Sequence, residues 1–210
     1  ISQRLYEAGH ITYMRTDSVN LSEEALNNAE KIIYENFGKE YHKKRVFKTK
    51  SKSAQEAHEA IRPTNLSNEN AGKSESEKKL YNLIWRRTLA SQMSDSMFER
   101  TIVKIDLGGD KSFKATGEVL VFDGFLRLYN ENEDKSKLLP KLEEKSEIKI
   151  ENILSKEVFT KHPPRYSEAS LIKKMEDSGI GRPSTFAETV KKIKEREYVI
   201  KEEREGKIIE

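Results

Sequence analysis

Apolar residues recur every three to four positions over much of the first 97 residues, the spacing of helices with one buried face. Residues 2–8 predict a short helix that Gly9 ends, and a second helix should begin at the capping residue Ser22. A third should begin at Ser74, where S-E-S-E indicates a capping box. The stripe of this third helix is Leu80, Tyr81, Ile84, Trp85, Thr88 and Leu89. We expect Trp85 to be core, because its neighbours at helical spacing are apolar.

Two stretches of the same region are less regular. Residues 54–61 have helical composition, and the helix should stop before Pro63, because the residue before a proline is pushed out of the helical region. Residues 41–53 form a basic connector that fits a solvated loop and a phosphate-tracking strip equally well.

From Phe98 the pattern changes to strict alternation. Residues 103–107 alternate apolar and polar, Gly108-Gly109-Asp110 is a hairpin signal, and residues 113–119 alternate on the return. Residues 121–129 and 147–154 predict two further strands. The middle of the chain is therefore expected to be an antiparallel β unit of four or so strands.

After Pro163-Pro164 the helical spacing returns. Ser167 should cap a helix that Gly179 stops, and a glycine-rich turn over residues 181–185 leads into a second helix. Residues 198–200 and 207–209 then resemble a hairpin wing. The fold class expected is α+β and multidomain: a helical domain over 1–97, an antiparallel β arch or hinge over 98–160, and the start of a helical, winged-helix-like DNA-binding domain over 161–210.

Composition narrows the class of protein. Only 35% of residues are hydrophobic and 36% are charged, which favours several small cores over one large core. The net charge of +3, from 39 basic and 36 acidic residues, requires any basic surface to be local. The absence of cysteine excludes disulfides and thiolate metal sites and fits a reducing compartment. No apolar run reaches the ~20 residues of a membrane span, and there is no signal peptide. The chain starts without Met inside a helical pattern, so we expect a piece of a longer protein.

The densest chemistry lies between Gly9 and Ser18. If this segment is extended, Tyr13 and Arg15 point to the same side. A tyrosine hydroxyl can attack a phosphodiester while an arginine fork binds the phosphate oxygen that gains charge. A tyrosine pKa of about 10 makes the hydroxyl a poor nucleophile without help. Spacing alone favours the simpler interpretation, a half-buried strand with a packed tyrosine and a solvated arginine. Asp17 could orient Arg15 or could be a turn residue.

A second candidate site is the turn from Gly181 to Thr185. A glycine-rich turn that enters a helix exposes backbone N–H groups, and the helix dipole favours an anion there. Arg182, Ser184 and Thr185 add side-chain donors, and Arg196, about three helical turns further on, would contact a different phosphate or a base. From the residues alone, capping by Ser184 with solvated arginines is equally good.

Three motifs in the same order resemble the type IA DNA topoisomerases, and the bacterial topoisomerase I branch fits better than the topoisomerase III branch. Gly9 to Ser18 resembles the active-site segment G-x-I-T-Y-x-R-T-D-S of that family. Residues 53–64 (SAQEAHEAIRPT) and 163–199 (PPRYSEASL…GIGRPSTF…YV) resemble two further family segments. Two departures are small: His10 replaces an apolar or aromatic residue, and Glu197 replaces the usual glycine.

The resemblance implies a function and a site. Tyr13 would be the nucleophile that keeps the 5′ phosphate, so that religation needs no ATP, and Arg15 would steady the phosphoryl charge. His58, Arg182, Ser184, Thr185 and Arg196 would bind DNA, mainly through phosphates. The metal would be Mg²⁺ in the parent enzyme, held by an acidic cluster in a Toprim domain; no such D-x-D-x-E run occurs here, so no metal ligands are expected in this chain. The isolated piece should therefore be inactive.

The expected partner is DNA, in single-stranded segments of negatively supercoiled duplex. We expect no membrane association, a monomeric parent enzyme, and a cytoplasmic, nucleoid-associated location. Two alternatives stay open. One is a non-catalytic winged-helix DNA-binding module with Tyr13 in its core, which would form no denaturation-resistant adduct with DNA. The other is an interaction scaffold, which would not bind single strands even at low salt.

Overall fold

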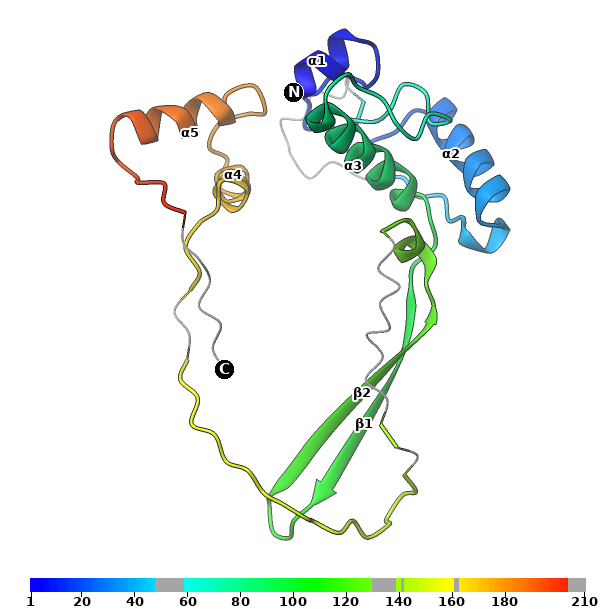
Figure 1. The fold of residues 1–210 in the computed structure, drawn as a ribbon, viewed down its shortest axis with the longest axis vertical. Coiled ribbons are helices and arrows are strands. Elements are labelled where there is room, and N and C mark those ends of the chain that lie inside the picture. Colours follow the sequence, from blue (N-terminus) through cyan, green and yellow to red (C-terminus); the bar gives the residue numbers. More distant parts are fainter. Residues whose placement is uncertain (48–58, 130–138, 141, 161–162, 204–210) are drawn as a thin grey trace.

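The structure, a computed structural model, describes residues 1–47, 59–129, 139–140, 142–160 and 163–203. The elements follow the chain as α1 (Ser2–Glu7), α2 (Glu23–Asn36), the 3₁₀ helix η1 (Lys39–Tyr41), α3 (Glu75–Ser91), β1 (Met97–Asp106), β2 (Ser112–Phe122), the 3₁₀ helix η2 (Gly124–Tyr129), α4 (Glu168–Asp177) and α5 (Phe186–Glu195). They form an open arch, in which α1–α3 and the α4–α5 pair lie on opposite sides of an open space and a long β-hairpin projects from the first group (Figure 1). This mixture of helices with a small antiparallel sheet confirms the α+β class, and the three domain boundaries stay a prediction.

The main core lies among α1, α2 and α3. The helix caps are those that the sequence predicts: the Ser22 side chain accepts a hydrogen bond from the Ala25 N–H, and Ser74 and Glu77 form a capping box. Trp85 is buried and its indole N–H donates to the Leu66 carbonyl at 2.8 Å, so its prediction as core is confirmed. The buried cluster consists of Leu5, Ile11, Ala29, Ile32, Ile33, Tyr41, Leu66, Tyr81, Trp85, Leu89, Ala90, Met93 and Leu128.

The hairpin is longer and simpler than expected. β1 and β2 pair antiparallel from Met97 opposite Phe122 to Asp106 opposite Ser112, and the turn between them contains Gly108 and Gly109, both with positive φ. The sheet has two strands in the described parts of the chain, so the prediction of four or so strands is wrong.

Of the strand predicted over residues 121–129, Val121 and Phe122 form the end of β2, and residues 124–129 form the 3₁₀ helix η2 instead. Gly124, with φ +50°, turns the chain so closely over Ser94 and Asp95 that a Cβ there would meet the Asp95 backbone at 2.6 Å. The Phe125 N–H donates to the Ser94 carbonyl at 3.0 Å, and Leu128 is buried in the helical core. The apolar residues of this stretch therefore pack on helices rather than on a neighbouring strand.

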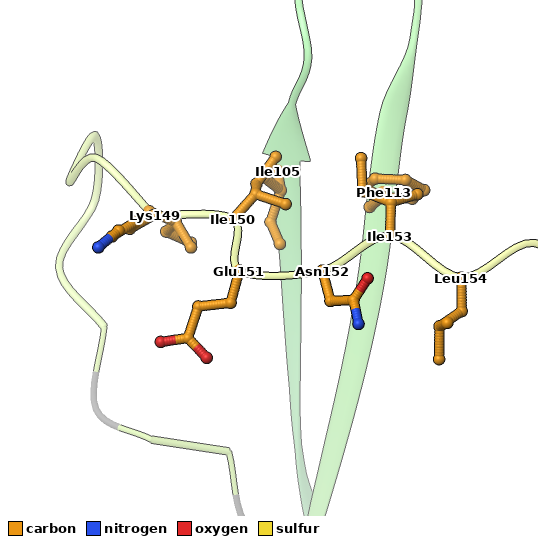
Figure 2. A pocket seen from close by; sticks show the side chains of 9 residues that line it. Ile105, Phe113, Lys149, Ile150, Glu151, Asn152, Ile153 and Leu154 are labelled. Atoms are coloured by element: carbon orange, nitrogen blue, oxygen red, sulfur yellow. The ribbon is translucent and has the colours of Figure 1, made fainter.

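The predicted strand over residues 147–154 has no regular secondary structure. This stretch crosses the far end of the hairpin, where Ile148 to Leu154 line an open apolar pocket with Ile105 and Phe113 (Figure 2). A strand needs a neighbour for its backbone hydrogen bonds, and within the described ranges this segment has none.

The α4–α5 pair agrees with the helices predicted after Pro163. Ser167 caps α4, and Met175 of α4 and Val190 of α5 are buried. The strand 207–209 of the predicted wing lies outside the described residues, and residues 198–200 have no strand structure. Across the described part of the chain, no helix combines the length and apolar character needed to cross a membrane.

Candidate active-site segment and DNA-binding turn

The end of α1 sets the direction of the segment that carries Tyr13. Gly9 has φ +73°, and its N–H donates to the Tyr6 carbonyl at 2.8 Å, while the His10 N–H donates to the Leu5 carbonyl at 2.9 Å. These two bonds make a Schellman motif, which needs a residue with positive φ at the position of Gly9. The chain therefore leaves α1 in one defined direction.

Tyr13 and Arg15 are exposed, whereas Ile11 is buried and Met14 packs partly against the core. Tyr13 is 37% exposed. Bends at Thr12, Met14 and Arg15 and a single bridge at Ile11 take the place of a continuous strand, so the segment is not extended throughout, and the common side of Tyr13 and Arg15 stays a prediction. Both interpretations of the segment, a catalytic pair and a half-buried strand with a packed tyrosine and a solvated arginine, stay open at this point.

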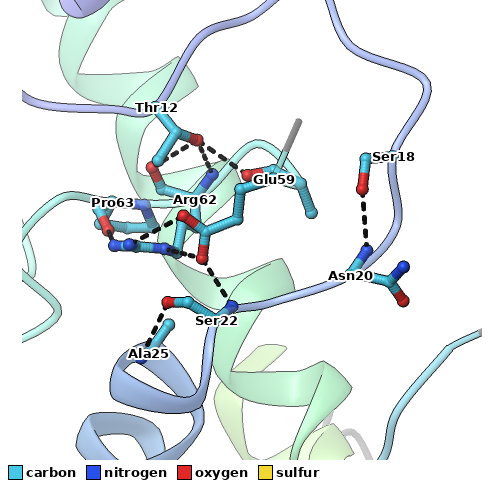
Figure 3. A network of polar contacts seen from close by, with 9 residues as sticks. Thr12, Ser18, Asn20, Ser22, Ala25, Glu59, Arg62 and Pro63 are labelled. Atoms are coloured by element: carbon cyan, nitrogen blue, oxygen red, sulfur yellow. Dashed lines mark hydrogen bonds and ion pairs between the residues drawn. The ribbon is translucent and has the colours of Figure 1, made fainter. Parts of the chain in front are cut away.

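Residues 60–64 are hydrogen-bonded to residues 10–12 through backbone groups and the Thr12 hydroxyl, and we call this contact the clasp (Figure 3). The Thr12 N–H donates to the Arg62 carbonyl at 2.9 Å, and the Thr12 hydroxyl donates to the Ala60 carbonyl at 2.8 Å and accepts from the Arg62 N–H at 2.9 Å. Two residues before Thr12, the His10 carbonyl accepts from the Thr64 N–H at 3.0 Å. The backbone directly before Tyr13 is therefore fixed at His10 and at Thr12.

Glu59 and Arg62 join this clasp to the start of α2. The two Glu59 oxygens accept from the Arg62 guanidinium at 2.7 and 3.0 Å, and Oε1 also accepts from the Ser22 N–H at 2.7 Å. Burial raises the pKa of Glu59, but the hydrogen bonds from Arg62 and Ser22 outweigh burial and hold this pKa below its usual value. Glu59 therefore has a structural role, which is to join the Arg62 segment to the start of α2.

His58 lies outside the described residues, so its predicted phosphate contact stays a prediction. The described end of its segment, residues 59–61, is not helical, so the prediction of a helix as far as residue 61 is wrong there. The physical reason is a bond to a distant segment. The Ala60 N–H donates to the Asn20 carbonyl at 2.8 Å and so is not available to a carbonyl four residues earlier, as a helix would require.

Tyr6 is a neighbour of Tyr13 that the sequence analysis missed. The two rings meet edge to face with centroids 5.4 Å apart and planes at 68°. Tyr6 stands seven positions before Tyr13, across a helix end, and no periodic pattern connects two residues in that relation. Asp17 forms no bond with Arg15 in the described structure.

The predicted turn before α5 holds three of the other candidates. Arg182, Ser184 and Thr185 are all exposed. The Arg182 N–H donates to the Thr185 hydroxyl at 2.8 Å, and the Arg182 carbonyl accepts from the N–H groups of Thr185 and Phe186. The helix begins after Thr185, and the capping considered for Ser184 is not what the structure shows.

Arg196 lies at the other end of α5, where it is exposed. The two arginines are thus separated by the length of a ten-residue helix, about 15 Å. The next residue, Glu197, has φ +57° and occupies the position of a second Schellman turn, with its N–H bonded to Lys194 and that of Tyr198 bonded to Ile193. Glu197, where the family has glycine, therefore strains the end of α5 but still donates its backbone N–H.

The basic residues on α5 and at its two ends divide into two groups. Lys191, Lys192 and Lys194 are engaged in ion pairs with Glu195, Glu188 and Glu168 respectively. Arg182 and Arg196 take part in no ion pair among the residues that the structure describes. No group of three histidine, cysteine or acidic residues in the described ranges could hold a metal ion.

Comparisons with known proteins point to one family along nearly the whole chain. A family model described as DNA topoisomerase matches residues 1–209. The chain is 46% identical to DNA topoisomerase 1 of Helicobacter pylori over an alignment that covers 100% of the chain and 30% of that protein. It is 48% identical to DNA topoisomerase 1 of Campylobacter jejuni, with 95% of the chain and 30% of the relative covered.

A solved structure is similar as well. Full-length topoisomerase I from Thermotoga maritima matches with a TM-score of 0.66 and 37% sequence identity, over 91% of this chain and 31% of that one. The chain therefore spans about 30% of the length of the relatives that it matches.

Proposed function

This chain belongs to the bacterial DNA topoisomerase I family, and we propose that it carries the nucleophile of a parent enzyme that relaxes negatively supercoiled DNA. The enzyme would cut one strand through a 5′-phosphotyrosine at Tyr13, pass DNA through the break and reseal it. ATP is not needed, because the phosphotyrosine bond keeps the energy of the phosphodiester.

One observation supports this proposal above the others. Tyr13 and Arg15 are both exposed. Met14, between them, packs partly against the core, and Ile11, two residues before Tyr13, is buried in it. The core tyrosines Tyr41 and Tyr81 are 7% and 1% exposed, against 37% for Tyr13. An exposed phenol and guanidinium on a clasped backbone are instead held ready for a ligand, which is how proximity lowers a barrier.

The chemistry follows from the two side chains. The Tyr13 hydroxyl oxygen forms a bond to phosphorus as the bond from phosphorus to the 3′ oxygen breaks. The tyrosine proton is released and the 3′ oxygen takes one up, so religation runs the same steps backwards. Arg15 donates to the phosphate oxygens as their charge grows, and such a donor lowers the barrier because it needs no reorganisation.

The described residues do not fit a metal site, so no step here runs through a metal ion. We propose that Mg²⁺, if the parent enzyme uses it, is held by residues outside this chain.

DNA binding is proposed for His58 and for Arg182, Ser184, Thr185 and Arg196. The support for the last four is their exposure and, for the two arginines, the contrast with the ion-paired lysines of α5. Arg182 and Arg196, at the two ends of α5, suit successive parts of one extended single strand.

The decisive test is Tyr13→Phe in the parent enzyme. This change removes one oxygen and keeps the ring, so no covalent protein–DNA adduct should form, while single-strand affinity stays near wild type. If Tyr13 were only packed, the cost would be at most the ~1 kcal/mol of an ordinary hydrogen bond, and activity would persist. Tyr34→Phe, at another exposed tyrosine on α2, is the matched control and should keep full activity. An adduct that still maps to this segment in the Tyr13→Phe enzyme would sink the assignment.

A further inference from the structure

The ring of Tyr6 touches the ring of Tyr13 edge to face, with centroids 5.4 Å apart. Tyr6 is itself 42% exposed, so little of its side chain serves the core. It lies one residue after Leu5, which is 1% exposed and belongs to the buried cluster. The ring contact of Tyr6 within the described residues is with Tyr13.

The helix that carries Tyr6 is held firmly. Leu5 is buried, and the Arg4 guanidinium donates to the Glu77 carboxylate of α3 at 2.5 Å. Glu77 is itself fixed, because it accepts from the backbone N–H groups of Lys73 and Ser74. Tyr6 is therefore presented from a helix anchored to α3, independently of the clasp that holds the backbone at Thr12.

An exposed tyrosine on an extended segment can occupy several χ1 rotamers, and only one of them can align its hydroxyl with a given phosphate. A second ring that packs against its edge or face favours one rotamer over the others. The two rings stand on separately anchored backbones, so the contact restricts the Tyr13 side chain and not only the chain direction.

We propose that Tyr6 is a positioning residue that holds the Tyr13 ring in the rotamer from which its hydroxyl attacks DNA. The inference rests on the proposed function of Tyr13 and adds to it a residue that would touch the nucleophile without taking part in bond making. The contact acts through the ring of Tyr6, so its hydroxyl is dispensable. The energy of one aromatic pair corresponds to a change of about 2- to 10-fold in rate.

The experiment uses the full-length parent enzyme with Tyr6→Ala, Tyr6→Leu and Tyr6→Phe. Single-turnover cleavage of a single-stranded oligonucleotide is measured beside the Kd for the same oligonucleotide. Tyr6→Ala and Tyr6→Leu should slow cleavage by about 2- to 10-fold with Kd unchanged, and Tyr6→Phe should restore the wild-type rate. Tyr6→Leu keeps apolar volume on α1, so it also serves if Tyr6→Ala fails to fold.

Tyr34→Ala is the matched control. Tyr34 is also an exposed tyrosine on a helix of the same block and makes its own edge-to-face contact, with His42 at 5.3 Å. Its loss should leave both the cleavage rate and Kd unchanged.

Three results would overturn the proposal. Wild-type cleavage by Tyr6→Ala and Tyr6→Leu would remove the positioning role. An equal loss in Tyr6→Phe would assign the effect to the hydroxyl. A weakened Kd in proportion to the rate would make Tyr6 a DNA contact. The proposed function fails separately, only if Tyr13→Phe still forms the covalent adduct.

Discussion

Arg15 differs in its surroundings from three arginines of the helical block that are held by carboxylates. Arg4 is paired with Glu77, Arg45 with Asp95, and Arg62 with Glu59. Arg15 is exposed and has no ion pair among the residues described. A guanidinium kept apart from carboxylates retains its full charge and hydrogen-bonding fork for a phosphate.

Replacement of Arg15 by Ala in the parent enzyme should therefore slow adduct formation by about 10²–10³, the usual effect of losing one transition-state donor. Arg15→Lys should recover part of the rate, because it restores the charge but not the fork. The rates are measured in single-turnover cleavage. Arg87→Ala, at an exposed arginine on α3, is the control. Arg15→Ala cleavage at the wild-type rate would leave Arg15 as a solvated side chain.

At the scale of elements, the start of α3 depends on one acid. Glu77 accepts from the backbone N–H groups of Lys73 and Ser74 and from the Arg4 guanidinium. These bonds, the one from Lys73 first, lower the pKa of Glu77 to about 2. The carboxylate is thus stabilised in the folded state and joins α1 to α3.

The sign of the resulting pH dependence follows from the lowered pKa of Glu77. A folded-state pKa below that of the unfolded chain stabilises the fold above the ordinary pKa of about 4.5, and this contribution is lost as the pH falls toward about 2. Glu77→Gln should lower the stability of the 210-residue chain at pH 6 and flatten its loss between pH 5 and 2. Urea unfolding followed by Trp85, the single tryptophan, measures both.

Glu75→Gln is the matched control for that experiment, because Glu75 lies in the same first turn but its side chain is 78% exposed. Its loss should leave the pH dependence almost as in the wild-type chain. Equal pH profiles for Glu77→Gln and the wild-type chain would contradict the role given to Glu77.

The turn that begins α5 carries a prediction about binding. Arg182→Ala in the parent enzyme should weaken single-strand affinity and lower the salt slope by about 0.7, the value for one single-strand phosphate contact. Lys191→Ala also removes one positive charge, from within α5, but at a lysine that is paired with Glu195. We expect a smaller change there in both quantities. Equal affinities and slopes for Arg182→Ala and wild type would return Arg182 to a solvated role.

At the scale of the whole molecule, the base of the hairpin is tied to the helical block. The Tyr41 hydroxyl donates to Asp123 at 2.7 Å and accepts from Arg127 at 2.6 Å, and the ring of Tyr41 packs against Phe122 with centroids 4.8 Å apart. From that base the hairpin extends to the far end of the arch, where the chain returns toward α4 (Figure 1). Tyr13 and the turn at Arg182 thus belong to separate parts of one open chain.

The 210-residue chain by itself should bind single-stranded DNA but neither cleave nor relax supercoiled DNA efficiently. The chain covers 30% of its relatives, and the acidic cluster that the family resemblance implies does not occur in its sequence. Gel assays of the purified chain with supercoiled plasmid and Mg²⁺ measure this directly. Robust Mg²⁺-dependent relaxation would contradict the division of the site between this chain and the rest of the parent enzyme.

The sequence alone determined those features whose causes are local. A cap at Ser22 or Ser74 and the end of α1 at Gly9 depend on backbone geometry within a few residues. The family could be recognised from the order of its motifs for the same reason, since each motif is a continuous stretch.

Tertiary structure decided the rest. The residue types of 121–129 and the alternation of 147–154 predict strands, but whether an apolar side chain packs on a sheet or on a helix depends on which distant surface lies beside it. The clasp of Thr12 by Arg62 joins positions 50 residues apart, and the contact of Tyr6 with Tyr13 crosses a helix end. Such contacts form only when separate backbones pack together, and periodicity along one segment carries no information about its neighbours in space.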